Sequence, residues 1–352
     1  MHKVLITGGT GFLGRSLAFH LTSRGHRVAV MARPSDRAEA IWSKGIGFHA
    51  GDVRDRKAVQ KAVRGHDVVV HLAAAYRAEG RPYRDFEEIN VGGTKNVLEA
   101  CVANDVGRVL HVSTTGVYGV LKKLPADEGQ PYHHTDAYQK TKVFGEQLAW
   151  EMFNGPLAGR GVVIRPTGVY GPGDTRILKL VRGIDRGYFV RPGPCKNLYH
   201  PSYVDDVMDG FERAITSPNA PGNAYNLAGR EYMPMRQYLA TIARLLGRPE
   251  PRFQVPLLPL KVAAEVCGHI GRWTRIEPPL YPRRLGFFHF DRAFSIEKGK
   301  AEIGYEPQVT IEEGLKRTIA WWRSVGLLGS TGPASAQTAK AATALGATAP
   351  FV

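Results

Sequence analysis

Three side chains in the middle of the sequence have the types and spacing needed for proton transfer. Tyr138 and Lys142 are four residues apart in residues 138–152, which have helical periodicity, so they share one face of a helix. A phenol with a pKa of about 10 is a poor base at neutral pH, but an ammonium group one turn away favours the phenolate. Thr114 follows an expected strand over residues 108–112, and its hydroxyl can donate to a substrate oxygen. These residues predict a catalytic set that exchanges a proton with an alcohol or carbonyl oxygen.

A glycine-rich turn near the N-terminus predicts the site of a cofactor beside this set. An apolar strand over residues 4–6 leads into glycines spaced three apart, and a helical pattern follows over residues 12–23. Glycines let backbone N–H groups approach a pyrophosphate, and the helix N-terminus points its partial positive charge at the same group. A nicotinamide dinucleotide held there would exchange a hydride with a secondary alcohol or ketone. The expected cradle consists of Gly8, Thr10, Gly11, Phe12, Leu13 and Gly14.

Strands and helices alternate through the first half of the chain, which predicts the α/β class. The pattern indicates a Rossmann fold, a doubly wound parallel sheet with ligand at the carboxyl ends of the strands, followed by a smaller C-terminal substrate-binding lobe. The six strands are expected over residues 4–6, 27–32, 47–50, 68–72, 108–112 and 161–164. The expected parts are an NAD(P)-binding domain over residues 1–165, a mainly substrate-binding lobe over residues 166–328, and a flexible tail over residues 329–352. Residues 200–228 are expected to return to the sheet.

Side chains at the expected strand ends refine the cofactor prediction. Arg33 follows the second strand, where an acidic residue suits NAD and an arginine suits the 2′-phosphate of NADP. NADP is therefore favoured over NAD, although a surface arginine is the plainer explanation. Asp52 and Val53, at the end of the third strand, are expected near the adenine. Ala73, Ala74 and Ala75 follow the fourth strand, and their small side chains leave space for a cofactor, but tight packing predicts them equally well. The cofactor contacts expected there are Leu72, Ala73 and Ala74.

The composition of the 352-residue chain limits the classes of partner that can be expected. Its formal charge is +15, but Lys and Arg are scattered, so a small-molecule substrate is favoured over nucleic acid. Three distant cysteines predict neither a metal site nor disulfides, and they suit the cytoplasm. The first strand begins too early to leave room for a signal peptide, and polar residues interrupt the most apolar stretch, residues 255–270, so no membrane span is expected.

With these residues in place, the chain resembles the extended short-chain dehydrogenase/reductase family, also called the NAD-dependent epimerase/dehydratase family, over about the first 325 residues. The resemblance implies that the catalytic hydroxyl is that of Thr114 and that Tyr138 and Lys142 also contact the cofactor. It implies further cofactor contacts at Asn90, Arg165, Pro166 and Thr167, and a homodimer through helices starting near Asp85 and Tyr138. The matching motifs are residues 7–14, 71–74, 90–96, 113–119, 138–142, 165–172 and 203–207.

Two departures from the family pattern bear on the substrate. Gly168 stands where the nucleotide-sugar epimerases usually carry an asparagine, and Tyr199 stands where they often carry an arginine. Both argue against a nucleotide-sugar substrate. Arg33 and the Pro-Thr-Gly after Arg165 look more like the dihydroflavonol-reductase and hydroxysteroid-dehydrogenase branch, so an NADP- or NAD-dependent oxidoreductase is favoured. Two alternatives stay open: a nucleotide-sugar epimerase or dehydratase with tightly bound NAD, and a non-catalytic NAD(P)-sensing binding protein.

Overall fold

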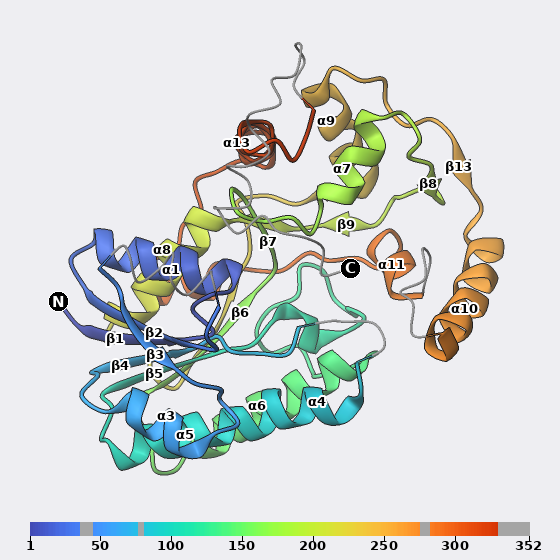
Figure 1. The fold of residues 1–352 in the computed structure, drawn as a ribbon. Coiled ribbons are helices and arrows are strands. Elements are labelled where there is room, and N and C mark those ends of the chain that lie inside the picture. Colours follow the sequence, from blue (N-terminus) through green and yellow to red (C-terminus); the bar gives the residue numbers. More distant parts are fainter. Residues whose placement is uncertain (36–44, 77–80, 275–281, 330–352) are drawn as a thin grey trace.

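A seven-stranded parallel sheet lies at the centre of the computed structural model, which describes residues 1–35, 45–76, 81–274 and 282–329 (Figure 1). The strand order is β11-β6-β5-β4-β1-β2-β3, and all six pairings are parallel. The strands are β1 (Lys3–Thr7), β2 (Arg27–Ala32), β3 (Gly47–Ala50), β4 (Val68–His71), β5 (Arg108–Val112), β6 (Gly161–Pro166) and β11 (Ala224–Leu227). The predicted Rossmann fold class is confirmed.

The strand order reverses between β1 and β4, which is the point where such sheets bind ligands. At the carboxyl ends of these two neighbours, Thr7 Oγ1 lies 2.8 Å from His71 Nδ1. The same Thr7 oxygen accepts a hydrogen bond from the backbone of Ala73. The loops that follow β1 and β4 are therefore tied together at the switch point.

Helices cover both faces of the sheet (Figure 1). α1 (Phe12–Ser23) and α8 (Val204–Thr216) lie on one face, and α3 (Arg56–Val63), α5 (Gly93–Ala103) and α6 (Ala137–Phe153) lie on the other. A hydrophobic core lies on each face of the sheet, and successive strand residues point into the two cores alternately. Val4 and Ile6 pack on the α1 side, whereas Leu5 packs on the α5 side. A sheet that is buried on both faces explains the continuous apolar runs of its central strands.

The helical segment between β4 and β5 is interrupted. The chain forms α4 (Tyr83–Glu87), then a turn of π-helix, η1 (Glu88–Gly92), and only then α5. A Cβ at Gly93 would lie 2.7 Å from Val53 Cγ2. The glycine therefore lets α5 approach the loop after β3 more closely than any other residue would allow.

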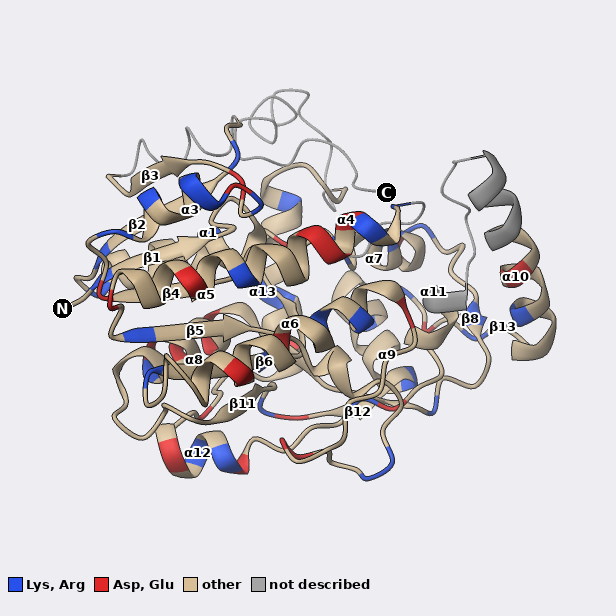
Figure 2. Cartoon of the chain, turned by 90° about the horizontal axis from the view of Figure 1, so that it is seen from below, with Lys and Arg blue, Asp and Glu red and all other residues tan. Residues whose placement is uncertain are grey.

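Beyond the carboxyl ends of the strands the chain builds a second layer, seen around α7, α9 and α13 in Figure 1. Its helices are α7 (Leu178–Asp185), α9 (Met235–Leu246), α10 (Leu257–Thr274), α11 (Pro282–Phe287) and α13 (Ile311–Ser324), whereas α12 (Glu297–Ile303) packs against β11 and α8 at the edge of the central sheet (Figure 2). Three pairs of short strands accompany them: β7 (Gly168–Tyr170) with β10 (Pro201–Tyr203), β9 (Leu198–Tyr199) with β12 (Met233–Pro234), and β8 (Arg191–Pro192) with β13 (Gln254–Val255). Within residues 200–228, β11 joins the central sheet and α8 covers it, but β10 pairs with β7 instead.

Long-range polar contacts fix this layer. The indole of Trp322, in α13, donates to the carbonyl oxygen of Asp174 at 2.8 Å. The buried carboxylate of Asp206, in α8, accepts hydrogen bonds from the backbone of Gln308 and Val309. Of the expected tail, residues 330–352 lie outside the described residues.

Charged side chains are distributed over many elements (Figure 2). α5 and α12 carry both basic and acidic side chains, whereas α3 carries only basic ones. Within the described part of the chain, no helix is long and apolar enough to cross a membrane. The same residues contain no group of three or more His, Cys, Asp or Glu side chains that could hold a metal ion.

Candidate functional site

The glycine turn is built from close backbone contacts. Gly8 has a φ of +73° and donates its N–H to the carbonyl oxygen of Met31. A Cβ at Gly8 would lie 2.8 Å from the backbone of Ala73, and one at Gly14 would lie 2.4 Å from the oxygen of Gly8. α1 then begins after Gly11 without a side-chain cap, so no capping side chain engages its first N–H groups. Such a cradle fits the pyrophosphate of a dinucleotide, with Thr10, Phe12 and Leu13 in the same turn.

The residues after β2 and β3 surround the place expected for the adenosine. Arg33 is exposed directly after β2. Asp52 is bound by Arg54 through its backbone and side chain, and this hydrogen bonding lowers the pKa of the carboxyl. The charge of Arg33 contributes to the same shift, so Arg33 and Asp52 lie near each other. Val53 is buried against α5, and its backbone carbonyl accepts a hydrogen bond from Asn96 Nδ2.

Asn90 holds the loop after β4. Its Oδ1 accepts from the Ala75 N–H at 2.7 Å, and its Nδ2 donates to the Ala75 carbonyl and to Thr141 Oγ1. The amide therefore ties η1 to α6 and shapes the segment that contains Leu72, Ala73 and the exposed Ala74. The side-chain polar atoms of Asn90 are all hydrogen-bonded inside the protein. The role of Asn90 that the structure shows is to position the backbone of this loop.

The start of α6 is fixed by reciprocal caps. The Asp136 carboxylate accepts from the N–H of Gln139, and the Gln139 side chain accepts from the N–H of Thr135, each at 2.7 Å. Tyr138 therefore stands in the first turn of the helix. It is 8% exposed, and its ring packs edge-on against Tyr76 with 5.4 Å between centroids.

Lys142 lies one turn further along the same face of α6 and is buried. Its ammonium group donates to the carbonyl oxygen of Val112, the last residue of β5, at 2.7 Å. Burial lowers the pKa of Lys142 to about 8, against the opposing attraction of Glu146. Burial and the charge of Lys142 also lower the pKa of His71, to about 3, and that of His111. The two imidazoles beside the ammonium group are therefore neutral at physiological pH.

Thr114 is the most accessible of the three hydroxyl residues after β5. Ser113 and Thr115 are buried, whereas Thr114 is only partly buried. Its Oγ1 accepts a hydrogen bond from the N–H of Gly116 at 3.1 Å. This bond uses an acceptor site of the oxygen and leaves the hydroxyl proton available for donation.

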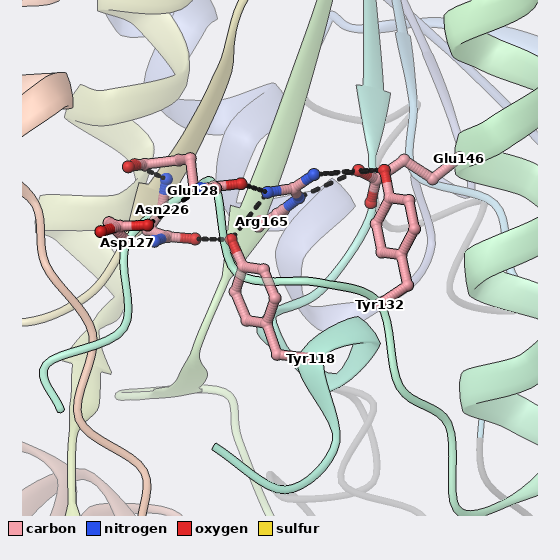
Figure 3. A network of polar contacts seen from close by, with 8 residues as sticks. Tyr118, Asp127, Glu128, Tyr132, Glu146, Arg165 and Asn226 are labelled. Carbon is pink, nitrogen blue, oxygen red and sulfur yellow. Dashed lines mark hydrogen bonds and ion pairs between the residues drawn. The ribbon is translucent and has the colours of Figure 1, made fainter. Parts of the chain in front are cut away.

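Arg165, in β6, is held by a network of internal polar contacts. Its guanidinium donates to Glu146 at 2.9 and 2.5 Å and to the hydroxyl of Tyr118 at 2.7 Å (Figure 3). Further bonds join it to the Glu128 carbonyl and the Tyr132 hydroxyl. The guanidinium thus has several partners inside the protein, and the cofactor contact at Arg165 stays a prediction.

The two residues that follow Arg165 also have internal partners. The carbonyl of Pro166 accepts from Thr115 Oγ1 at 3.4 Å, and Thr167 Oγ1 lies 2.5 Å from Ser202 Oγ. These bonds bring the end of β6 beside the hydroxyl residues after β5. Pro166 and Thr167 therefore border the region around Thr114.

The sequence did not reveal the pair Tyr76 and Arg176. Arg176 is held by the Asp174 carboxylate at 2.7 Å and by the Val169 carbonyl, and it stacks over the ring of Phe12 at 5.5 Å. The guanidinium also interacts with the hydroxyl of Tyr76. Arg176 thus links the glycine turn to the neighbour of Tyr138. No motif marks either residue, whereas Glu146 had a signal in its spacing of four from Lys142.

A parallel sheet of this order, with a glycine cradle at its switch point, defines a Rossmann-type dinucleotide-binding protein. More narrowly, the chain belongs to the NAD dependent epimerase/dehydratase family, whose family model matches residues 4–228. The family resemblance recognised in the motifs is thereby confirmed. The protein is an enzyme of an NAD-dependent family, related to dehydrogenases and reductases.

Characterised relatives include hydroxysteroid dehydrogenases and a reductase. The chain is 30% identical to 3beta-hydroxysteroid-dehydrogenase/decarboxylase isoform 1 of Arabidopsis thaliana, covering 90% of this chain and 78% of the relative. It is 31% identical to 2-alkyl-3-oxoalkanoate reductase of Stenotrophomonas maltophilia, covering 90% and 98%. These relatives agree with the hydroxysteroid-dehydrogenase-like branch.

Solved structures share the architecture over nearly the whole chain. The crystal structure of gox2253 superposes with a TM-score of 0.78 at 26% identity, covering 92% of this chain and 99% of that one. The dTDP-glucose 4,6-dehydratase DesIV of Streptomyces venezuelae gives a TM-score of 0.75 at 23% identity, covering 93% and 99%. The second likeness concerns the fold alone.

Proposed function

We propose that the protein interconverts a secondary alcohol and a ketone on a small or medium-sized organic molecule. Tyr138 is the acid/base, Lys142 keeps its phenolate favoured and holds the cofactor ribose, and Thr114 polarises the substrate oxygen. The names of the two characterised relatives, a hydroxysteroid dehydrogenase/decarboxylase and an oxoalkanoate reductase, support chemistry at a carbon–oxygen bond.

One observation carries this proposal: the contact between Lys142 Nζ and the Val112 carbonyl. It holds the ammonium group one helical turn from Tyr138. Val112, the residue to which the ammonium group is bound, lies two residues before Thr114. The three groups of the expected catalytic set are thus joined by a helix, a hydrogen bond and a strand end. If the Tyr and Lys spacing had arisen by chance on a solvated helix face, both side chains would be exposed. Instead, Tyr138 and Lys142 are buried beside the end of β5.

Each side chain then has a defined task. When bound, the nicotinamide ring supplies or takes up the hydride. Thr114 donates its hydroxyl proton in a hydrogen bond to the substrate oxygen, because its own oxygen already accepts from Gly116. Tyr138 gives its proton to that oxygen in reduction and takes it back in oxidation. Lys142 stabilises the phenolate form of Tyr138 and can donate its remaining N–H groups to the ribose.

We further propose NADP(H) as the preferred cofactor, because Arg33 is exposed at the end of β2. A homodimer is supported by two partly exposed aromatic residues, Tyr83 of α4 and Phe144 of α6, which lie on either side of Lys140. A cytoplasmic location is supported by the three cysteines, which are all free.

The test is the oxidation of NADPH and NADH by a panel of ketones, with the wild-type protein and Tyr138→Phe. The proposal expects turnover by the wild-type protein, and a loss of about a hundredfold or more in the variant with unchanged cofactor affinity. Bound NAD that survives dialysis, together with no oxidation of NADPH by any ketone, would instead indicate the epimerase or dehydratase alternative and overturn the proposal.

A further inference from the structure

One corner of the second layer exposes several large apolar side chains to solvent. This α10 corner consists of residues 186–194 and 252–267, which form β8, β13, the N-terminal part of α10 and the residues around the two strands. β8 and β13 pair in parallel, and the three elements lie together at the edge of the molecule in both views (Figures 1 and 2). Apart from Met1 and Tyr76, the large apolar side chains of the described chain that are more than half exposed all belong to this corner: Tyr188, Phe253, Leu258, Val262 and Val266.

α10 packs on the second layer through one of its faces. Ala264 is fully buried, and Leu257, Leu260 and Cys267 are partly buried. On a helix with 3.6 residues per turn, these four positions lie within about 80° of one another. A Cβ at Gly193, in the turn after β8, would stand 2.7 Å from Leu257 Cγ. The packed face thus holds the start of α10 against this turn.

The opposite face of α10 is exposed and also apolar. Leu258, Val262 and Val266 are four residues apart, so they form a stripe about 12 Å long on this face. The exposed Lys261 and Glu265 lie beside the stripe, between it and the packed face. A helix that only covers the protein's own core carries polar residues on its outer face. The stripe therefore indicates a surface that makes apolar contacts outside the described chain.

Phe253 extends this apolar surface from the strand pairing. Its carbonyl oxygen accepts a hydrogen bond from the N–H of Arg191 in β8 at 3.0 Å, yet its side chain is 83% exposed. A stable protein interface buries about 800 Å² on each partner, far more than a stripe about 12 Å long and one ring provide. A lipid bilayer needs no matching shape, and it takes up aromatic and aliphatic side chains that project from a helix or loop.

Basic residues border the apolar side chains. Residues 185–196 and 248–267 contain six Lys or Arg and three Asp or Glu. Two of the three acidic side chains are bound by arginines in ion pairs, at 3.3 and 3.1 Å. The exposed Arg252 directly precedes Phe253, and Lys261 lies beside the stripe. With the formal charge of +15 on the whole chain, this distribution is complementary to the anionic headgroups of a membrane surface.

We propose that the α10 corner is a docking surface for an anionic lipid bilayer. Phe253, Leu258 and Val262 insert between the lipid headgroups, while Arg252 and Lys261 contact the lipid phosphates. The helix lies on the bilayer and does not cross it, since no helix among the described residues is long and apolar enough to span a membrane. This inference does not depend on the proposed reaction.

The first test is flotation of the full-length protein with vesicles of phosphatidylcholine alone, or of equimolar phosphatidylcholine and phosphatidylglycerol, at low and high salt. Binding is expected to the anionic vesicles, weakened by salt but not abolished, because the apolar contacts are not screened. Phe253→Ser/Leu258→Gln/Val262→Gln is expected to lower the partition coefficient about tenfold or more. Arg252→Gln/Lys261→Gln should lower it about tenfold at low salt.

The matched control removes exposed apolar side chains from other elements. Phe19→Ser/Val102→Gln changes α1 and α5, and it should bind vesicles like the wild-type protein. All these variants should keep the melting temperature, because the altered side chains are solvent-exposed. A wild-type protein that binds no vesicles, or an equal loss of binding in the control and in the variant of the α10 corner, overturns the proposal.

Fluorescence quenching identifies the side chains that enter the bilayer. The tryptophan of Phe253→Trp is expected to be quenched by brominated lipids, whereas that of Phe19→Trp is not. Equal quenching of the two, or none at Phe253→Trp, overturns the assigned orientation. If the protein instead ignores vesicles and self-associates with rising concentration, and the triple variant of the α10 corner does not, the corner binds a second copy of the chain and the lipid proposal is wrong.

Discussion

Lys142 Nζ lies 2.7 Å from the carbonyl oxygen of Val112, so a buried ammonium group of α6 is anchored to the last residue of β5. The contact explains how a helix and a strand place their functional groups together without a motif that spans both. It also places a positive charge in the interior, where Glu146 provides only part of the compensation.

Stability is expected to rise with pH above about 8 because of Lys142. The pKa of this lysine is about 8 in the folded protein, against 10.5 for a solvated lysine side chain in the unfolded chain. Between these values the unfolded chain binds more protons, so raising the pH stabilises the folded state. The difference corresponds to about 3 kcal/mol, which is gained fully only above pH 10.5. Urea unfolding from pH 7 to 10.5 should show a gain in the wild-type protein that Lys142→Met lacks; parallel curves would contradict the shift.

Thr114→Val is expected to lower kcat/KM about a hundredfold, because it removes both the donor to the substrate oxygen and the acceptor for Gly116. Thr114→Ser keeps the hydroxyl and should retain most of the activity. A neighbouring variant, Ser113→Ala, removes a buried hydroxyl without a partner and should leave kinetics unchanged. Steady-state kinetics on the three variants decides the assignment; equal losses in Thr114→Val and Ser113→Ala would speak against it.

Arg33→Ser is expected to weaken NADP binding by about tenfold or more while NAD binding stays the same, since only NADP carries the 2′-phosphate that an arginine recognises. Calorimetric titration of both dinucleotides measures the effect. Arg54 is the matched control, because its guanidinium is already bound by Asp52. If Arg33→Ser weakens both dinucleotides alike, Arg33 does not select the cofactor.

The pair of Arg165 and Glu146 is expected to behave as a buried ion pair. Arg165→Met alone leaves the fully buried Glu146 carboxylate without its cation and should cost about 3–5 kcal/mol of stability. Arg165→Met/Glu146→Leu removes both charges and should recover most of this loss. Denaturant unfolding of the single and double variants tests the pair. A double variant that is as unstable as the sum of the single ones would show that the charges act independently.

The sequence predicted the sheet well because its signals are local. Apolar runs bounded by glycines mark β1, β2 and β5, and the spacing of Tyr138 and Lys142 marks their shared helix face. The position of Thr114 after a strand was likewise readable from neighbouring residues. These features depend on periodicity within a few residues.

The rest depends on contacts between distant segments. Arg165 follows a family motif, but the sequence does not show that its guanidinium turns toward Glu146 of α6. Arg176 reaches Phe12 and Tyr76 across distant parts of the chain, which no local pattern encodes. The proximity of Gly168 and Tyr199 is of the same kind: each was noticed as a departure from the family pattern, and only the structure shows that they are neighbours.

The pairing of β11 with β6 also constrains how the protein folds during synthesis. β6 is buried along its whole length, yet its outer neighbour is made about 60 residues later, where Ala224 pairs with Val163. Until that segment leaves the ribosome, the nascent sheet has an apolar edge with unpaired backbone groups, which is a surface prone to aggregation. The other six strands of the sheet have been translated by that time. Until β11 pairs with β6, we expect the exposed edge of β6 to need the protection of a chaperone.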